Sequence, residues 1–199
     1  MIILARHGQT RFNLAGIIQG QTDSPLTSAG LAETHKMPGL ISRFRPEMIY
    51  SSSLGRAAFS SSIYSQILSI PVRFRSALAE LSCGKWEGLK RDDVVLGDRT
   101  IRPNWTNRPP GGESYQDGEK RLIPFIEEIR SLANDRCIII LAHAGLNRAF
   151  VRLFLDLKIE ETLFVRFPHD TTYLIHTDGT VHRLGLSTGA GNGFLSEIQ

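Results

Sequence analysis

The sequence has few cysteines and no long apolar segment. Two of its 199 residues are cysteine, Cys83 and Cys137, and they form neither a CxxC motif nor another metal-ligand spacing. No stretch approaches the roughly 20 apolar residues of a membrane span. The apolar run at the N-terminus is too short for a signal peptide and has no basic segment before it. These absences argue against a metal-binding cysteine motif and a membrane partner, and they predict a cytoplasmic protein.

Basic runs of the kind that nucleic-acid-binding proteins carry are also absent, so we expect no nucleic acid as a partner. The formal net charge is +3, and 41% hydrophobic and 22% charged residues are typical of a globular protein with about one domain. The small basic excess fits an anionic ligand, although a solvated mixed surface explains most of these charges better. A homodimer is left open.

Short apolar runs alternate with amphipathic segments along the chain. Strands are expected at residues 2–5, 47–51, 72–74 and 138–142, and helices at residues 28–44, 55–69, 114–133 and 146–157. Pro38 and Pro124 should kink or disturb two of these helices. Continuous apolar strands that alternate with helices predict an α/β fold, a three-layer α/β/α sandwich around a mostly parallel central sheet.

The C-terminal part of the chain adds an antiparallel edge hairpin to this prediction. Asp178–Gly179 predicts a two-residue turn, in which Ile175 pairs with His182 and the side chains of His176 and His182 point to opposite faces. Residues 1–186 are expected to form one domain, with the irregular segment 82–112 as a lid or substrate loop. Residues 187–199 are expected to be a flexible tail.

Polar side chains follow the ends of the predicted strands. Arg6 and His7 follow the first strand, Arg56 and Glu80 follow the next two, and His143 follows the strand at 138–142. Ligands of open parallel sheets bind outside the carboxyl ends of the strands, so these five side chains should converge. Two guanidiniums can bind phosphate oxygens through paired hydrogen bonds. The sequence has no P-loop and no carboxylate cluster, which predicts phosphoryl transfer without a metal or cofactor.

Six stretches of the chain, in this order, resemble motifs of the histidine phosphatase superfamily, also called the phosphoglycerate mutase-like family. They are LARHGQTRFN (4–13), GIIQGQTDSPLTSAG (16–30), IYSSSLGRA (49–57), AELSCGKWEG (79–88), PPGGES (109–114) and LAHAG (141–145). RHG alone is not specific, whereas the ordered set is. The small phosphatase branch is favoured because PPGGES runs directly into a helix and AHAGLN replaces the HGN typical of mutases.

The resemblance implies a role for each residue at the convergence point. His7 would attack phosphorus and become a phosphohistidine, and Glu80 would protonate the leaving oxygen and then activate water. The phosphoryl oxygens would be bound by Arg6, Arg56 and His143. Further contacts with phosphate or substrate are implied for Asn13, Gln19, Gly20 and the backbone of Ala144. This chemistry requires a neutral His7 and favours a cationic His143.

Some positions depart from the family pattern or permit a second interpretation. Ser53 stands where the family usually has aspartate, and Ala144 where glycine is common. Arg56 begins a predicted helix, where the helix dipole disfavours a cation unless an anion is bound. His169 either contacts the substrate or caps a loop.

The implied function is a metal-independent phosphatase that acts on a small-molecule phosphomonoester through a phosphohistidine on His7. A cofactor-dependent phosphoglycerate mutase is the first alternative, because it shares this pocket. The second is a catalytically weak phospho-ligand or protein-binding module.

Overall fold

A seven-stranded sheet forms the centre of the computed structural model, which describes residues 1–94 and 101–196. The spatial order of the strands is β3-β2-β4-β1-β6-β7-β8. Their bounds are β1 (Ile2–Arg6), β2 (Met48–Ser51), β3 (Val72–Phe74), β4 (Ile138–Ala142), β6 (Thr171–Ile175), β7 (Val181–Gly185) and β8 (Gly189–Asn192). β1 to β4 are parallel, and β6, β7 and β8 continue the sheet as an antiparallel meander.

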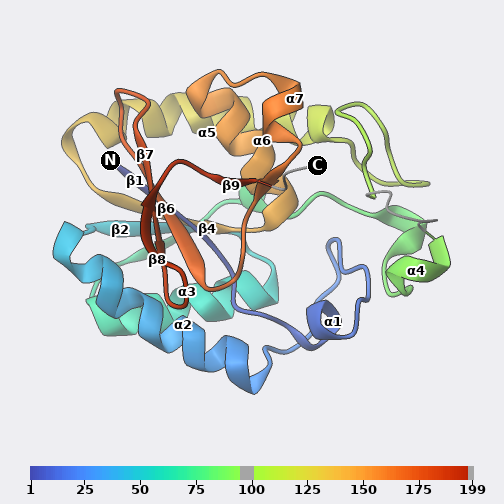
Figure 1. Ribbon diagram of the computed structural model, residues 1–199, viewed down its shortest axis with the longest axis horizontal. Coiled ribbons are helices and arrows are strands. Elements are labelled where there is room, and N and C mark those ends of the chain that lie inside the picture. Colours follow the sequence, from blue (N-terminus) through green and yellow to red (C-terminus); the bar gives the residue numbers. More distant parts are fainter. Residues whose placement is uncertain (95–100, 197–199) are drawn as a thin grey trace.

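Helices cover both faces of the sheet, as Figure 1 shows. α2 (Ser28–Ile41) and α3 (Gly55–Leu68) pack together on one face, and α5 (Tyr115–Asp135) and α6 (Ala144–Leu155) pack together on the other. The predicted α/β class and three-layer arrangement are therefore confirmed. No helix within residues 1–94 and 101–196 is long and apolar enough to cross a membrane.

Alternate residues of the central strands supply the two halves of the hydrophobic core. Ile2, Leu4 and Ile140 belong to the cluster under α5 and α6, whereas Ile3 and Ile139 belong to the cluster under α2 and α3. All five side chains are fully buried. A strand buried on both faces has no need of alternating polar residues, which explains why these runs are continuously apolar.

Neither helix is split at its proline. α2 continues through Pro38 and ends at Ile41, and α5 continues through Pro124 to Asp135. Each proline removes one backbone hydrogen bond. The buried faces of both helices, such as Met37 in α2 and Ile129 in α5, supply packing that outweighs this loss.

The C-terminal hairpin has a different register from the predicted one. Ile175 pairs with Val181, and residues 177–179 form a three-residue loop in which Gly179 has φ +88°. This shift by one residue places His176 and His182 on the same face, with ring centroids 5.5 Å apart. The prediction that they point to opposite faces is wrong, because Thr180 pairs with His176 instead of Thr177.

Residues 187–196, predicted to be part of a flexible tail, form ordered strands. β8 extends the sheet by pairing with β7, and β9 (Leu195–Ser196) pairs with β5 (Val165–Arg166). Phe194 packs between Phe167 and Tyr173, which explains why this segment is held in place. Residues 197–199 lie outside the described part of the chain.

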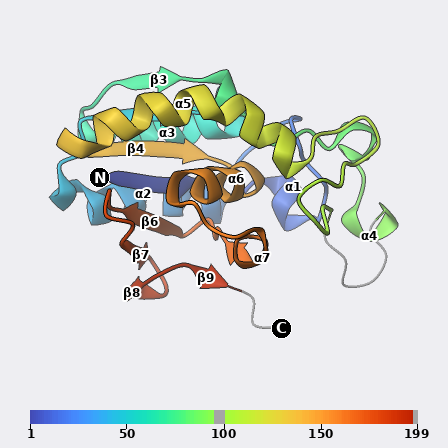
Figure 2. The ribbon, with the colours of Figure 1, turned by 90° about the horizontal axis from the view of Figure 1, so that it is seen from above.

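The remaining short helices lie around the carboxyl ends of the parallel strands or beside α6. α1 (Arg11–Leu14) and α4 (Arg91–Val94) lie beyond the point of the β4 arrow in Figure 2. α7 (Ile159–Thr162) packs against α6. The loops that carry α1 and α4 therefore surround the sheet edge at which the sequence places the polar residues.

Candidate active site

A cavity of about 520 Å³ opens at the carboxyl ends of the parallel strands. β4 lies between β1 and β2, so the residues that follow these three strands become neighbours. Eight of the nine predicted site residues line the cavity: Arg6, His7, Asn13, Gln19, Gly20, Arg56, Glu80 and Ala144. His143 is fully buried, and its ring centroid is 5.1 Å from that of His7.

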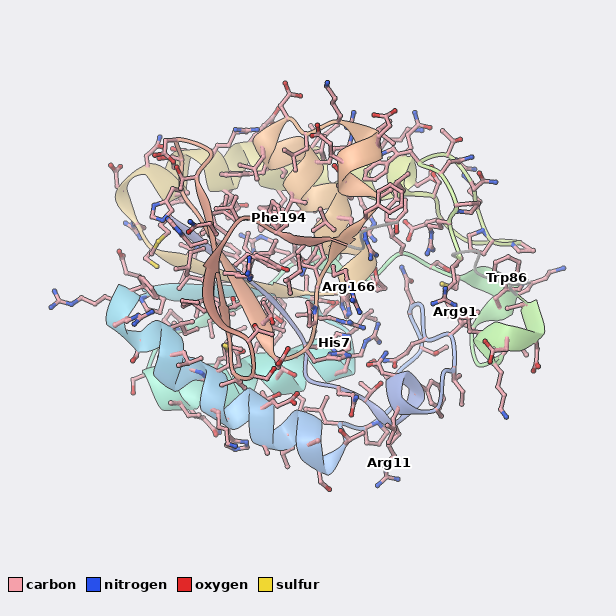
Figure 3. All side chains as sticks on the ribbon, in the orientation of Figure 1. His7, Arg11, Trp86, Arg91, Arg166 and Phe194 are labelled. Carbon is pink, nitrogen blue, oxygen red and sulfur yellow. The ribbon has the colours of Figure 1, made fainter. Side chains whose placement is uncertain are left out.

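His7 is held in one tautomer by the backbone. Its Nδ1 lies 2.8 Å from the carbonyl oxygen of Gly8, which can only accept a hydrogen bond, so Nδ1 carries the proton. Nε2 is then the unprotonated nitrogen, and Nε of Arg56 donates to it at 3.2 Å. His7 is 3% exposed and lies near the centre of the molecule in Figure 3, whereas Arg91, the first residue of α4, lies toward the right of the view. Nε2 is thus the ring nitrogen whose lone pair could act as a nucleophile.

Burial and the surrounding cations keep the histidines of the site neutral. Burial lowers the pKa of His7 well below its usual value, and His143, Arg6 and Arg56 lower it further. Burial and the two arginines also lower the pKa of His143. The expected split between a neutral His7 and a cationic His143 is therefore not present in the protein alone. A phosphoryl dianion beside His143 would raise its pKa, because an anion favours the charged imidazolium.

Arg56 is fixed by an aspartate that the sequence prediction missed. Nη1 of Arg56 lies 2.8 Å from Oδ1 of Asp23, whose two carboxylate oxygens also accept from the backbone amides of Gly55 and Arg56. Asp23 thus caps the N-terminus of α3, where Leu54 supplies no side-chain cap. The predicted conflict between Arg56 and the helix dipole is relieved by this carboxylate before any ligand binds.

The loop before α2 contributes the other partners of Arg56. Nη2 donates to the carbonyl oxygen of Gly20 at 2.7 Å, and Gly20 has φ +52°, a conformation that favours glycine. The amide of Gln19 fits its neighbours when its oxygen accepts from Nε and Nη1 of Arg56 at 2.8 and 3.0 Å and its nitrogen donates to Thr10. Asn13 forms a capping box with Thr10. Gly20 and Gln19 therefore fix the orientation of the Arg56 guanidinium and also line the cavity.

Glu80 is positioned by the start of α6. Its carboxylate accepts hydrogen bonds from the backbone amides of Leu81, Gly145 and Leu146 at 2.9 to 3.1 Å. A Cβ atom at Gly145 would lie 2.7 Å from Oε1 of Glu80, so only glycine permits this approach. The sequence motif that contains Gly145 thus determines where the candidate proton donor lies.

His143 and Arg6 each have one nitrogen with a hydrogen-bond partner and one without a partner among residues 1–94 and 101–196. Nε2 of His143 lies 2.8 Å from Oγ of Ser52, a residue that the sequence prediction did not select, and Nη1 of Arg6 donates to the carbonyl oxygen of Phe167. Within the described residues, Nδ1 of His143 and Nε of Arg6 are buried without a partner. Buried polar atoms are normally satisfied, so a ligand oxygen would complete this site.

His169 supports the backbone of His7 rather than lining the cavity. Its Nδ1 donates to the backbone carbonyl oxygen of His7 at 2.7 Å, and the two rings are 5.3 Å apart. Burial and the neighbouring Arg6 lower the pKa of His169 to about 3. Of the two interpretations left open by the sequence, the structure shows the cap.

The predicted lid, residues 82–112, contributes to the cavity wall from both halves, with Cys83 and Arg91 in the N-terminal half. Ile101, Arg102 and Pro103 line the cavity, and Trp105 stacks on Tyr115 of α5 with ring centroids 4.6 Å apart. Arg102 is tied to the backbone of Ser82 and Glu113. Residues 95–100 of this segment lie outside the described part of the chain.

The fold and the site identify the class of protein. The model of the histidine phosphatase superfamily (branch 1) matches residues 2–186, and the chain belongs to this family. A glucosyl-3-phosphoglycerate phosphatase from Mycolicibacterium vanbaalenii is 28% identical, over 80% of this chain and 76% of that protein.

Two further relatives show the range of the family. A 2,3-bisphosphoglycerate-dependent phosphoglycerate mutase from Nitrobacter winogradskyi is 31% identical, over 82% of this chain and 84% of that protein. The solved structure of a mycobacterial glucosyl-3-phosphoglycerate phosphatase in complex with VO3 superposes with a TM-score of 0.77 at 25% identity, and covers 99% of this chain and 98% of that one. Relatives thus include both phosphatases and mutases.

Proposed function

We propose that this protein is a metal-independent phosphatase that hydrolyses a small-molecule phosphomonoester through a phosphohistidine on His7. The observation that carries the proposal is the fixed tautomer of His7, whose unprotonated Nε2 lies against Arg56 at the cavity. The family and its phosphatase relatives support the same reaction class.

In the first step, the lone pair on Nε2 of His7 attacks phosphorus and the bond from phosphorus to the leaving oxygen breaks. Glu80, in its acid form, donates its proton to that oxygen, so the product leaves as an alcohol. Arg6, Arg56 and His143 stabilise the charge on the phosphoryl oxygens. The proton on Nδ1 of His7 stays hydrogen-bonded to Gly8 and stabilises the ring as it becomes cationic.

In the second step, Glu80 accepts a proton from a water molecule that attacks phosphorus, and the phosphorus–nitrogen bond breaks. This step returns the lone pair to His7, the acid form to Glu80, and releases inorganic phosphate. Three backbone amides keep the Glu80 carboxylate in place between the two proton transfers. Asn13, Gln19, Gly20 and Ala144 would contact the phosphate or the leaving group from the cavity wall.

A phosphoglycerate mutase would use the same catalytic groups. Because one relative is such a mutase, phosphoglycerate mutase activity is the second candidate function. The test is phosphate release from a panel of sugar phosphates, nucleotides, phosphoserine, phosphoglycerates and ribazole phosphate at mildly acidic pH, with EDTA present. We expect release that EDTA does not abolish and that His7→Ala eliminates. Phosphoglycerate interconversion that depends on 2,3-bisphosphoglycerate, with little free phosphate, would favour the mutase. Binding without turnover, in wild type and His7→Ala alike, would favour the binding module.

A further inference from the structure

Two histidines lie close together on the C-terminal hairpin, at the other end of the sheet from the active site. His176 follows β6 and His182 lies on β7, and their ring centroids are 5.5 Å apart with the ring planes nearly perpendicular, at 89°. Ile2 pairs with Ile175, so the hairpin loop lies at the N-terminal end of β1, whereas His7 follows its C-terminal end. The pair is therefore separate from the catalytic groups.

The three-residue loop of the hairpin brings the two rings together. Leu174 pairs with His182, and the backbone amide of His176 donates to the carbonyl oxygen of Thr180. Side chains two positions apart on a strand share a face, so His176 lies on the same face as Leu174 and His182. A two-residue loop would have directed the histidines to opposite faces. The register thus creates a pair of imidazoles that the sequence analysis did not predict.

His182 is held in one tautomer by the edge strand β8. Its Nδ1 lies 3.0 Å from Oδ1 of Asn192, and an amide oxygen can only accept a hydrogen bond, so Nδ1 carries the proton. Nε2 of His182 then keeps its lone pair. Metal-bound histidines typically have this arrangement, in which the other ring nitrogen donates to an oxygen that fixes the ring. Both His176 and His182 are partly exposed, so an ion can reach them from solvent.

The distance between the two rings suits one tetrahedral ion. With a zinc–nitrogen bond of about 2.0–2.1 Å, two imidazoles on one zinc ion have ring centroids about 5 Å apart. The centroids of His176 and His182 are 5.5 Å apart, so a small rotation of either side chain would bring both rings to one ion. Arg183, the next residue of β7, has its guanidinium against Gly191 on the opposite face, so its charge does not lie between the two rings.

The other close histidine pairs are less suited to a cation. The ring centroid of His7 lies 5.1 Å from that of His143 and 5.3 Å from that of His169. The charges of Arg6 and Arg56 act on His7 and disfavour its protonated form. The same repulsion disfavours a metal ion at these rings. The pair on the hairpin is therefore where we expect a divalent cation to bind.

We propose that His176 and His182 bind one Zn²⁺ ion, with water completing its coordination. Residues 1–94 and 101–196 contain no group of three or more histidine, cysteine, aspartate or glutamate side chains that could hold a metal ion, so the chain supplies two ligands. Imidazole nitrogen is a ligand that suits zinc. The bound ion would link β6 to β7 and, through Asn192, to β8. It would stabilise this half of the sheet and take no part in phosphate hydrolysis.

The experiment is a titration of the EDTA-treated, dialysed protein with Zn²⁺, measured by isothermal titration calorimetry and by thermal unfolding. We expect one zinc ion per chain. At a zinc concentration 100 times Kd, the melting temperature should rise by about 5–10 °C, since an ion that binds only the folded state stabilises it. EDTA should reverse this rise.

The variants are His176→Gln and His182→Gln, with His35→Gln as the matched control. Loss of either ligand should weaken zinc binding by at least about tenfold, and should therefore reduce the rise in melting temperature by about half or more at the same zinc concentration. Asn192→Ala should weaken binding by about tenfold, because the acceptor that fixes His182 is lost. His35 is an exposed histidine on α2, and its replacement should leave zinc binding unchanged.

The melting temperatures of the metal-free variants are compared first, so that a folding defect is not mistaken for the loss of a ligand. Zinc binding as strong in His176→Gln and His182→Gln as in wild type would overturn the site. One zinc ion per two chains would overturn coordination completed by water, because a second copy would supply the remaining ligands. No heat of binding and no change in melting temperature at millimolar zinc would overturn the proposal as a whole.

Discussion

Asp23 should determine how well Arg56 binds phosphate, although it lies outside the motif that contains Arg56. Its carboxylate accepts from Nη1 of Arg56 and from the first two amides of α3. Asp23→Asn retains one acceptor oxygen for the helix but loses the charge. We predict that this substitution costs more free energy in phosphate binding than it costs in the free energy of unfolding.

The magnitude follows from the separate contacts. Loss of an N-terminal cap costs about 1 kcal/mol. The ion pair adds about 1 kcal/mol because Asp23 is 39% exposed on its side chain and solvent screens the pair. Asp23→Ala should therefore lower the free energy of unfolding by about 2 kcal/mol, and Asp23→Asn by roughly half of that. If Arg56 loses one charge-assisted bond to the phosphoryl group, kcat/KM should fall about tenfold to hundredfold.

The assay is kcat/KM for p-nitrophenyl phosphate together with the inhibition constant for inorganic phosphate. In Asp23→Asn, kcat/KM should fall and the inhibition constant for phosphate should rise, since both quantities depend on how tightly the site binds a phosphoryl group. Asp117→Asn is the matched control, because Asp117 also caps a helix and pairs with an arginine, but this arginine, Arg108, does not line the cavity as Arg56 does. An Asp23→Asn protein with wild-type phosphate inhibition and wild-type kcat/KM would refute the positioning role.

Two further predictions concern proton transfer and pH. Glu80→Gln should reduce kcat/KM for alkyl phosphates by about 10²–10⁴-fold, the usual contribution of general acid catalysis. It should affect kcat/KM for p-nitrophenyl phosphate far less, because kcat/KM reports the phosphorylation step and this leaving group needs no proton. An equal loss of kcat/KM on both substrates would contradict the assignment. The lowered pKa of His169, about 3, together with those of His7 and His143, means that the unfolded chain binds protons that the folded chain does not. The stabilisation from neutral burial is therefore present above pH 6.5 and is lost as the pH falls below it, by about 2 kcal/mol for His169 between pH 7 and pH 5. Urea unfolding of wild type and His169→Gln at both pH values tests this, and the same pH dependence in both proteins would argue against it.

The sequence predicted the sheet edge at which the site forms because strand ends are a local property. Apolar runs that stop at His7 and His143 identify the carboxyl ends of two buried strands, and parallel pairing of β1 and β4 then brings these residues together. The register of the final hairpin could not be predicted in the same way. Two-residue and three-residue loops both suit Asp178–Gly179, so the local sequence does not decide between them.

Supporting residues were harder to predict than the residues they support. Asp23 lies 33 positions before Arg56, and Ser52 lies 91 positions before His143, so no local pattern links either pair. The ordered tail has the same explanation, because Phe194 is held by Phe167 and Tyr173 rather than by its own glycine-rich surroundings. Contacts between distant segments are set by tertiary packing, which a single sequence does not display.

The central claim is that Nε2 of His7 carries the phosphoryl group during turnover. Rapid acid-free quenching of the wild-type protein with a labelled phosphomonoester, followed by peptide mapping, should locate acid-labile, alkali-stable phosphate on His7. The Glu80→Gln variant should accumulate more of this species when p-nitrophenyl phosphate is the substrate, since water attack is slowed. Turnover with no phosphate on His7, or full activity in His7→Ala, would contradict the mechanism.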